Sequence, residues 1–425
     1  MNLNYYRKEI DKKTYLNFIK TNKFKTNLIN IYFIRPLIKE EATINALLPL
    51  VLKRGTKNYN TSLDIQRKLE ELYGANLSID VSKKGERQVI RFTIEAPDAS
   101  YTESKDLIAQ AIEMLNEIIN QPLLEDKAFL EKYVEQEKEN LRKKIKGRIN
   151  DKKRYAIDRC IEEMCENENF KIYKYGYVED LNRIDGKSLY KHYQNVLATS
   201  NIEISVVGDI SQNDFEAIFK QIFTIIRGDI VDIPREKIDK QIDDVNVVLE
   251  NMDVSQGKLT LGYRMNIPYE DKLYDAFMIA NEILGGGPNS KLFLNVREKE
   301  SLAYYVFSQS YKFKSIMLMV SGIESENYDM AVDIMKKQVD EIQLGQFSES
   351  DIDQAKNSIM TSIVSLTDDN YSLSEFYLSQ ALTGDSRTID NMINQIMKVN
   401  KSDIIESFQK LKLDTIYFLS NKGNK

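Results

Sequence analysis

The sequence predicts an α+β fold made of two homologous domains, each an antiparallel-rich β-sheet packed with helices. Short apolar runs that alternate with polar residues predict hairpins, and longer runs with helical spacing predict amphipathic helices. The order of elements in residues 61–210, a helix, a hairpin, long helices and a final strand, recurs in residues 289–421. Such a recurrence is typical of an internal duplication.

The first half alternates strands with helices. Residues 61–74 are predicted to form a helix because Thr61 and Asp64 make a capping-box pattern at its start and Gly74 ends it. A second apolar helical run, before this one, stops at Gly55. That run covers 43–55, and the other elements are strands at 27–34, 75–82, 89–97 and 201–210, a helical region at about 103–165 and a helix at 211–223.

The second half repeats these features. We expect a strand pair within 245–267, helices at 273–286 and 290–301, a hairpin at 302–324, a helical region to about 411 and a final strand at 414–421. Between the halves, residues 229–243 are charged, contain a proline and lack apolar periodicity, which indicates a linker. The predicted domains are therefore residues 1–228 and 244–425.

Composition excludes several classes of protein. Apolar residues make up 42% and charged residues 29% of the 425 residues, which is typical of a globular protein. The 59 basic and 65 acidic side chains give a net charge of −6, so we expect no nucleic-acid partner. Residues 1–20 lack the apolar core of a secretion signal, and no stretch is apolar enough to span a membrane. We therefore expect a cytoplasmic protein without a membrane partner.

Cysteine and histidine are too rare for the sites that usually depend on them. The cysteines, Cys160 and Cys165, do not share a helix face, so we expect reduced thiols that pack as small apolar groups. The one histidine, His192, shares a predicted helix face with apolar residues and is expected to pack rather than to catalyse. A structural zinc knuckle, a catalytic triad with histidine and a zinc site with two histidines are therefore not expected within this chain.

The stretch ILGGGPNSK contains glycines but lacks the spacing of a phosphate-binding loop. A Walker loop needs a lysine followed by serine or threonine, whereas this lysine follows a serine and precedes a leucine. A dinucleotide-binding turn follows a strand, whereas these glycines follow a predicted helix. We expect a turn in which Gly285, Gly286 and Gly287 adopt positive φ and in which Asn289 or Ser290 caps the next helix.

Arg297 and Tyr304 follow this turn and lie seven residues apart. If the helix persists they share one of its sides, and if it ends near Ser301 then Tyr304 begins the next strand. Side by side, a guanidinium and a phenol would offer two hydrogen-bond donors to a peptide carbonyl or carboxylate. The alternative, which spacing alone favours, is that Arg297 pairs with a neighbouring glutamate while Tyr304 packs.

The same stretch, LGGGPNSKLFLNVREKESLAYYV, resembles the C-terminal-domain signature of the insulinase, pitrilysin and mitochondrial-processing-peptidase family of zinc metallopeptidases. That signature combines a glycine-rich turn, a helix and an R-E-K-x-x-L-A-Y run. Two further segments, NIEISVVGDISQNDFEAI and YKYGYVEDLNRIDGKSLYKHYQ, are similar to family segments near the end of the first domain. The resemblance covers essentially the whole chain and implies duplicated metallopeptidase-like halves that close around a peptide.

The catalytic motif of that family is H-x-x-E-H on a helix of the first domain, where the histidines bind zinc and the glutamate activates water. Aligned on KRGT, the motif falls on ALLPL, so Ala46, Pro49 and Leu50 replace His, Glu and His. The further glutamate ligand falls on Lys144. The resemblance therefore implies no catalytic residue and no metal in this chain. Within a helix, Pro49 costs about 3 kcal/mol unless the helix kinks.

In two-subunit members of the family, one subunit carries the zinc motif and the other supplies an arginine and a tyrosine across a shared chamber. Arg297 and Tyr304 match this pair in type and spacing. We therefore expect a non-catalytic subunit of a heterodimeric zinc peptidase, with a homologous zinc-bearing partner, a peptide substrate and zinc in that partner alone. One alternative is an inactive homologue that binds peptides or acts as a scaffold, as a homodimer and without a role in hydrolysis. A third is a self-sufficient peptidase with an unusual metal site.

Overall fold

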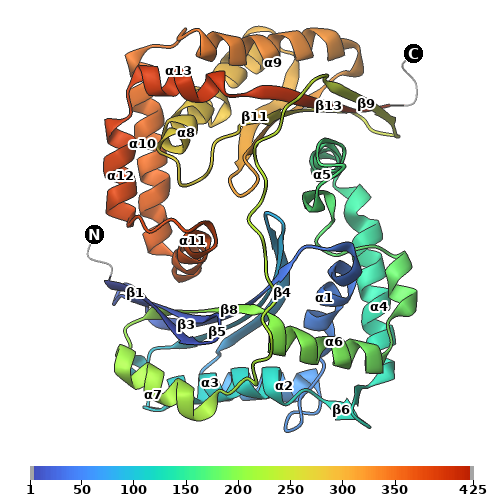
Figure 1. Ribbon diagram of the computed structural model, residues 1–425, viewed down its shortest axis with the longest axis vertical. Helices are drawn as coiled ribbons and strands as arrows, with labels where there is room; N and C mark the ends of the chain where they lie inside the picture. The colour runs from blue at the N-terminus through green and yellow to red at the C-terminus, as the bar shows by residue number, and fades with distance from the viewer. Residues whose placement is uncertain (1–3, 422–425) are drawn as a thin grey trace. The chain divides into compact units, whose positions relative to one another are not determined.

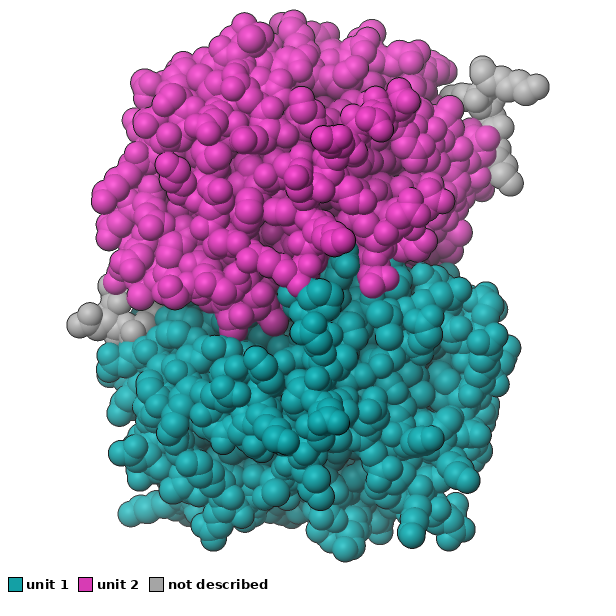
Figure 2. Space-filling view, in the orientation of Figure 1, with its two compact units in different colours: residues 1–146, 172–234, 366–379 teal, residues 147–171, 235–365, 380–425 magenta. Residues whose placement is uncertain are grey.

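The chain forms two compact units, and each unit contains segments from both halves of the sequence (Figure 2). The computed structural model describes residues 4–421. Unit 1 consists of residues 1–146, 172–234 and 366–379, and unit 2 of residues 147–171, 235–365 and 380–425. The predicted linker, 229–243, lies in a stretch without helix or strand that contains the passage from unit 1 to unit 2. The predicted continuous domains, 1–228 and 244–425, do not contain this exchange of segments.

Unit 1 is built on a six-stranded sheet (Figure 1). The strand order is β1 (Asn4–Asp11), β2 (Thr14–Lys20), β8 (Asn201–Gly208), β3 (Thr26–Pro36), β5 (Arg87–Pro97) and β4 (Asn76–Lys84). Neighbouring strands are antiparallel except β2 and β8, which are parallel. The helices are α1 (Lys39–Leu52), α2 (Ser62–Glu71), α3 (Leu107–Asn120), α4 (Glu131–Lys146), α6 (Gly186–Thr199) and α7 (Gln212–Ile222). A short hairpin joins β6 (Leu124–Glu125) to β7 (Ala128–Phe129).

The two faces of this sheet differ because side chains alternate along each strand. In β3, Ile31 belongs to the apolar core that the helices of unit 1 share. Its neighbours Asn30 and Tyr32 point to the opposite face, where both meet Ser374 of α11 (Asn370–Thr383) at 2.8 Å. Helix α11 therefore covers the polar face of this sheet although it comes from the second half of the sequence.

Unit 2 is built on a five-stranded sheet. The strand order is β11 (Ala303–Tyr311), β12 (Ile316–Ile323), β10 (Gly257–Arg264), β13 (Lys412–Ser420) and β9 (Asn246–Asn251). Strands β9 and β13 are parallel and the other neighbours antiparallel. The predicted pairing within 245–267 is wrong, because β13 lies between β9 and β10. The helices are α5 (Lys152–Met164), α8 (Lys272–Gly285), η5 (Phe293–Lys299), α9 (Tyr328–Gln343), α10 (Glu349–Ser365), α12 (Ile389–Lys398) and α13 (Lys401–Gln409).

Helix α5 comes from the first half of the sequence and packs on β10 and β13 of unit 2. Gly262 allows this close approach, because a Cβ there would lie 2.9 Å from the Met164 sulfur and 3.5 Å from the Cys160 sulfur. Cys160 and Cys165 are buried and free, and burial raises the pKa of both thiols. The prediction that both cysteines pack as small apolar groups is thus confirmed.

A buried cluster of charged groups fastens the chain just after α5 to the sheet of unit 2. Glu168 pairs with Lys314 at 2.5 Å and with Arg264 at 2.8 Å, and Arg264 also pairs with Asp414 at 2.8 Å. The side chains of Arg264 and Lys314 are only 2% and 1% exposed. Burial opposes ionisation of Glu168, but the two cations outweigh this effect and lower its pKa. The cluster therefore stays ionised and holds the exchanged segment in place.

The predicted fold class is confirmed, since each unit combines an antiparallel-rich sheet with helices. Helix α2 begins with the predicted capping box of Thr61 and Asp64, and Gly74 follows it with a φ of 75°. Helix α1 ends at Leu52, before Gly55. A Cβ at Gly55 would lie 2.7 Å from a neighbouring carbonyl oxygen, so this glycine serves a close backbone contact instead of ending the helix. Within residues 4–421, no helix is both long enough and apolar enough to cross a membrane.

Candidate functional site

The positions of the altered catalytic motif lie on α1, which packs against α4 in unit 1 (Figure 1). Ala46 and Pro49 are buried, and Leu50 packs against the apolar core. All three are hydrocarbon side chains, with no atom that can bind a metal or activate water. Helix α1 continues through Pro49 and ends three residues later, so the proline removes one hydrogen bond, to the Asn45 carbonyl, without ending the helix.

Lys144, at the predicted position of the last zinc ligand, reaches the ring of Tyr175. Its ammonium nitrogen lies 4.2 Å from the ring centroid, and that of Lys174 lies 4.8 Å from the same point. Burial by itself would raise the pKa of Tyr175. The hydrogen bonding and charge of the two lysines have the larger effect, so the pKa is lowered. An ammonium group has no lone pair for zinc, so these residues do not fit the metal of the family's active members. Among residues 4–421, no group of three or more His, Cys, Asp or Glu side chains is placed to hold a metal ion.

A buried chain of amide groups fastens the segment of Lys174 and Tyr175 to α1. Asn45 Nδ2 donates to Gln88 Oε1 at 2.9 Å, and Gln88 Nε2 donates to the Lys174 carbonyl oxygen at 2.8 Å. The side chains of Asn45 and Gln88 are fully buried. His192 Nε2 lies 2.7 Å from Asn45 Oδ1, so this histidine packs and orients the amide, as expected. No local signal in the sequence marks Lys174 and Tyr175. They lie in a turn, and Lys144, which meets them, lies on α4, far away in the sequence.

Gly176 lets the same segment touch α1 directly. Its φ is 70°, and a Cβ there would lie 2.0 Å from Thr43 Oγ1. That oxygen accepts a hydrogen bond from the backbone nitrogen of Tyr177 and donates to Asp180 Oδ2, both at 2.9 Å. The backbone on either side of Tyr175 is therefore held by hydrogen bonds to Gln88 of β5 and to Thr43 of α1.

The pH dependence of stability should report on His192. Burial lowers its pKa to about 4, whereas the unfolded value is about 6.5. The unfolded chain thus binds the proton more tightly than the folded chain does. The stability that neutral His192 contributes to the folded state is therefore complete above pH 6.5 and is lost as pH falls toward 4. We expect the free energy of unfolding to fall by up to about 3 kcal/mol across this window. His192→Gln keeps a hydrogen-bond donor but does not titrate. Urea unfolding of both proteins should show a free energy of unfolding that depends less on pH in the variant. An equal pH dependence would show that His192 is not the group responsible.

Arg297 and Tyr304 lie in unit 2, on either side of the end of η5. Arg297 is exposed, and its guanidinium carbon lies 4.8 Å from the centroid of the Phe293 ring. Ser301 has a φ of 52°, so the helix ends there and Tyr304 becomes the second residue of β11. Tyr304 is 53% exposed, and its hydroxyl donates to Glu324 Oε1 at 2.5 Å. Within the described residues, no hydrogen bond joins Arg297 to Tyr304.

The alternative arrangement of these two residues, an Arg297–glutamate ion pair with a packed tyrosine, is absent from residues 4–421. The hydrogen bond and charge of Glu324 raise the pKa of Tyr304, so the phenol keeps its proton. The guanidinium is therefore a solvent-facing donor, whereas the exposed phenol already donates its one proton to Glu324. Their role in substrate binding stays a prediction.

The glycine-rich turn differs from the prediction in its backbone. Gly285 ends α8, Gly286 has a φ of −79°, and Gly287 also lacks a positive φ. Close packing is the reason for a glycine at position 285, because a Cβ there would lie 2.5 Å from the backbone nitrogen of Ser308 in β11. The predicted cap is present, since Ser290 Oγ accepts a hydrogen bond at 3.4 Å from the backbone nitrogen three residues later. The stretch is thus a tightly packed helix end rather than a flexible loop.

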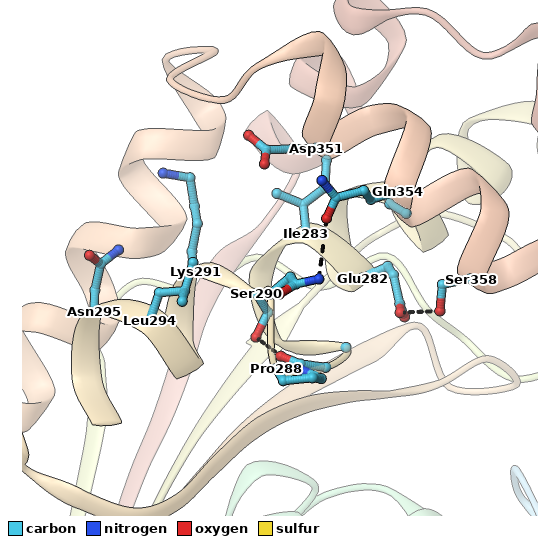
Figure 3. Close-up of a pocket in the computed structure, with 14 residues that line it drawn as sticks. Glu282, Ile283, Pro288, Ser290, Lys291, Leu294, Asn295, Asp351, Gln354 and Ser358 are labelled. Atoms are coloured by element: carbon cyan, nitrogen blue, oxygen red, sulfur yellow. Dashed lines mark hydrogen bonds between the residues drawn. The ribbon is translucent and has the colours of Figure 1, made fainter. Parts of the chain in front are cut away.

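A hollow of about 370 Å³ lies beside this turn, between the end of α8, the residues before η5, and α10 (Figure 3). Polar side chains that line it pair with one another. Ser358 Oγ donates to Glu282 Oε1 at 2.7 Å, and Asn289 Nδ2 donates to Gln354 Oε1 at 3.3 Å. Because these groups already satisfy one another, the hollow does not identify a ligand.

The chain has relatives among known proteins across nearly its whole length. Residues 183–359 match the family model described as "Peptidase M16 inactive domain". "Probable inactive metalloprotease YmfF" from Bacillus subtilis (strain 168) is 38% identical over 404 residues, which cover 95% of each chain. The chain belongs to the peptidase M16 family. It is an inactive homologue within that family, so the resemblance to zinc metallopeptidases is confirmed.

Other relatives of this M16 homologue extend the comparison. "Uncharacterized zinc protease YmxG" from the same Bacillus subtilis strain is 24% identical over 231 residues, which cover 53% of this chain and 54% of the relative. The crystal structure of a conserved protein from Enterococcus faecalis V583 matches with a TM-score of 0.90 and 30% identity, over 99% of this chain and all of that chain. A peptidase M16 inactive domain from Pseudomonas fluorescens matches with a TM-score of 0.82 and 16% identity over the whole of both chains, which shows a shared fold.

Proposed function

We propose that this M16 homologue is the non-catalytic subunit of a heterodimeric zinc peptidase. In that complex it binds the peptide substrate and supplies Arg297 and Tyr304 to the active site of a homologous partner, which holds the zinc. One observation carries the proposal. A motif without zinc ligands on α1 and an exposed arginine and tyrosine in the C-terminal signature occur in the same chain.

Arg297 and Tyr304 have the properties that stabilisation of a peptide carbonyl requires. The guanidinium presents a planar set of donors and is not tied to a carboxylate within the described residues. The phenol keeps its proton because the hydrogen bond and charge of Glu324 raise its pKa, and a substrate oxygen would take the place of Glu324 as the acceptor. A donor aimed at the oxygen where charge develops typically contributes about 3–4 kcal/mol to catalysis.

The relatives support the existence of a zinc-bearing partner. Bacillus subtilis holds both a protein named as a probable inactive metalloprotease and one named as a zinc protease, and both are similar to this chain. An inactive and an active homologue in one cell are the two components that a heterodimer requires. We expect the cell that makes this chain to make such a partner.

Substitution of Arg297 tests the proposed role in hydrolysis. The sample is this chain purified together with an M16 homologue from the same cell that carries H-x-x-E-H, and the readout is cleavage of a quenched fluorogenic peptide. We expect Arg297→Ala and Tyr304→Phe each to lower kcat/KM at least about tenfold, because each removes a donor to the substrate. Lys299→Ala, at an exposed position on the same segment, should change the rate little.

Two results separate this proposal from its alternative. Size-exclusion chromatography must show that the Arg297 variant still forms the complex. A partner that is fully active alone, and unaffected by Arg297→Ala in this chain, contradicts the proposal. That result, together with self-association, would instead favour a homodimeric peptide-binding or scaffold protein without a role in hydrolysis.

A further inference from the structure

Lys144, Lys174 and Tyr175 meet in unit 1 at a position that the family's motif assigns to zinc binding. We infer that these three residues form an anion site that binds a carboxylate of a peptide, either its C-terminal carboxylate or an acidic side chain. The inference rests on the proposed function only in taking a peptide as the ligand. It replaces a site for a dication with a site for the opposite charge.

The charge around these residues is not balanced by the protein. Lys144 and Lys174 form no ion pair with a carboxylate among residues 4–421. Two carboxylates in this region, Asp80 and Glu137, are each already paired with an arginine. Partial burial lowers the pKa of Lys53, the charge of Lys144 adds to this effect, and the charges of Asp80 and Glu137 oppose it. Lys144 and Lys174 therefore place positive charge beside Tyr175 without an ion pair of their own in the described part of the chain, and a bound anion would reduce their mutual repulsion.

The hydrogen-bonding groups at this position match a carboxylate. Lys144 and Lys174 are donors only, and the Tyr175 hydroxyl has no acceptor for its proton within the described residues. An ionised carboxylate accepts hydrogen bonds on both oxygens and strengthens them through its charge.

The site is held in place before any ligand binds. The Lys174 carbonyl oxygen accepts from the buried Gln88 amide, which is itself bonded to Asn45 of α1. Gly176 is pressed against Thr43, and the Tyr175 ring packs against the apolar core of unit 1. A fixed site loses less entropy on binding than flexible surface lysines do, which favours a specific contact. This buried support fixes Lys174 and Tyr175, and Lys144 reaches them from an exposed position on α4.

Calorimetric titration of the full-length chain with three peptides tests the inference. All three share one neutral sequence: the first ends in a free carboxylate, the second in an amide, and the third is amidated but contains one glutamate. We expect at least one carboxylate-bearing peptide to bind about tenfold more tightly than the neutral amide. Preference for the first identifies a C-terminal carboxylate, and preference for the third identifies an acidic side chain. Equal binding of all three, or no binding of any, overturns the inference.

Charge reversal identifies the residues responsible. The double variant Lys144→Glu with Lys174→Glu should lose the preference for carboxylate, and Tyr175→Phe should weaken it. Lys132→Glu, at an exposed position on the same helix α4, is the matched control and should keep it. Thermal unfolding establishes that each variant is folded, and Lys144→Met with Lys174→Met serves if reversal prevents folding. A preference that survives in the double variants overturns the site. Because binding is measured without a partner, such a failure leaves the outcome of the Arg297 experiment independent.

Discussion

Replacing Glu168 by glutamine is expected to lower the free energy of unfolding by about 3–5 kcal/mol. The change leaves the side chains of Arg264 and Lys314, only 2% and 1% exposed, without the carboxylate that they share. Arg264 keeps its ion pair with Asp414, but the two buried cations then share one carboxylate fewer, so less of their desolvation cost is compensated. Equilibrium unfolding in urea, followed by circular dichroism, measures the difference.

The control for this change is Glu166→Gln, two residues away and exposed, which should alter stability by less than about 0.5 kcal/mol. The effect of Glu168 should also fall as pH drops. The pKa of Glu168 is lower in the folded chain than its unfolded value of about 4.3. The stability that ionised Glu168 contributes is therefore complete above that value and is lost on acidification. If Glu168→Gln and Glu166→Gln were equally stable at neutral pH, the charged cluster would not be what holds the exchanged segment in unit 2.

Gly176→Ala is the second substitution with a large expected effect, a loss of roughly 3 kcal/mol in the free energy of unfolding. The position has a φ of 70°, and the new methyl group would lie 2.0 Å from Thr43 Oγ1. Strain in the backbone and overpacking against α1 therefore add. Since the same contact positions Lys174 and Tyr175, we also expect weaker binding of carboxylate-bearing peptides.

Gly287→Ala provides the matched control, because its Cβ would meet nothing within 4 Å and its φ is not positive. Its melting temperature should equal that of the unmodified chain within the error of the measurement. If Gly176→Ala were as stable as Gly287→Ala, the close contact between the Tyr175 segment and α1 would not be needed for folding.

Most helices and strands were predictable because their apolar periodicity is local. The hairpin of β1 and β2 was not predicted, and its first strand shows why. Strand β1 lies at the sheet edge with most of its side chains exposed, so its sequence, NYYRKEID, carries no alternating apolar pattern. A charged edge strand protects a sheet from further pairing but looks like a loop in the sequence.

Local sequence patterns also could not predict that α5 joins unit 2 and α11 mostly unit 1, but for a different reason. An amphipathic pattern identifies the apolar face of a helix, but it does not say which sheet that face will cover. The contacts that decide this join residues far apart in sequence, such as Tyr32 with Ser374 and Glu168 with Lys314. Only the folded chain brings these groups together.

The candidate sites divide in the same way. Residue type alone shows that Ala46, Pro49 and Leu50 have no atom that can bind a metal, wherever the fold places them. The meeting of Lys144 with Lys174 and Tyr175 was not predictable, because it requires α4 and a separate loop to approach each other. Positive φ at the glycine-rich turn was wrongly predicted from composition, since contact with β11 keeps Gly285 in the helix.

Peptide hydrolysis by three zinc-supplied samples decides whether this chain is a non-catalytic subunit: this chain alone, the H-x-x-E-H homologue alone, and the two combined. We expect no hydrolysis by this chain alone and a rate for the combined sample well above that of the homologue alone. Arg297→Ala should abolish this gain. Hydrolysis by this chain alone, with zinc bound in a one-to-one ratio, would show that the chain is itself a peptidase and overturn the proposal.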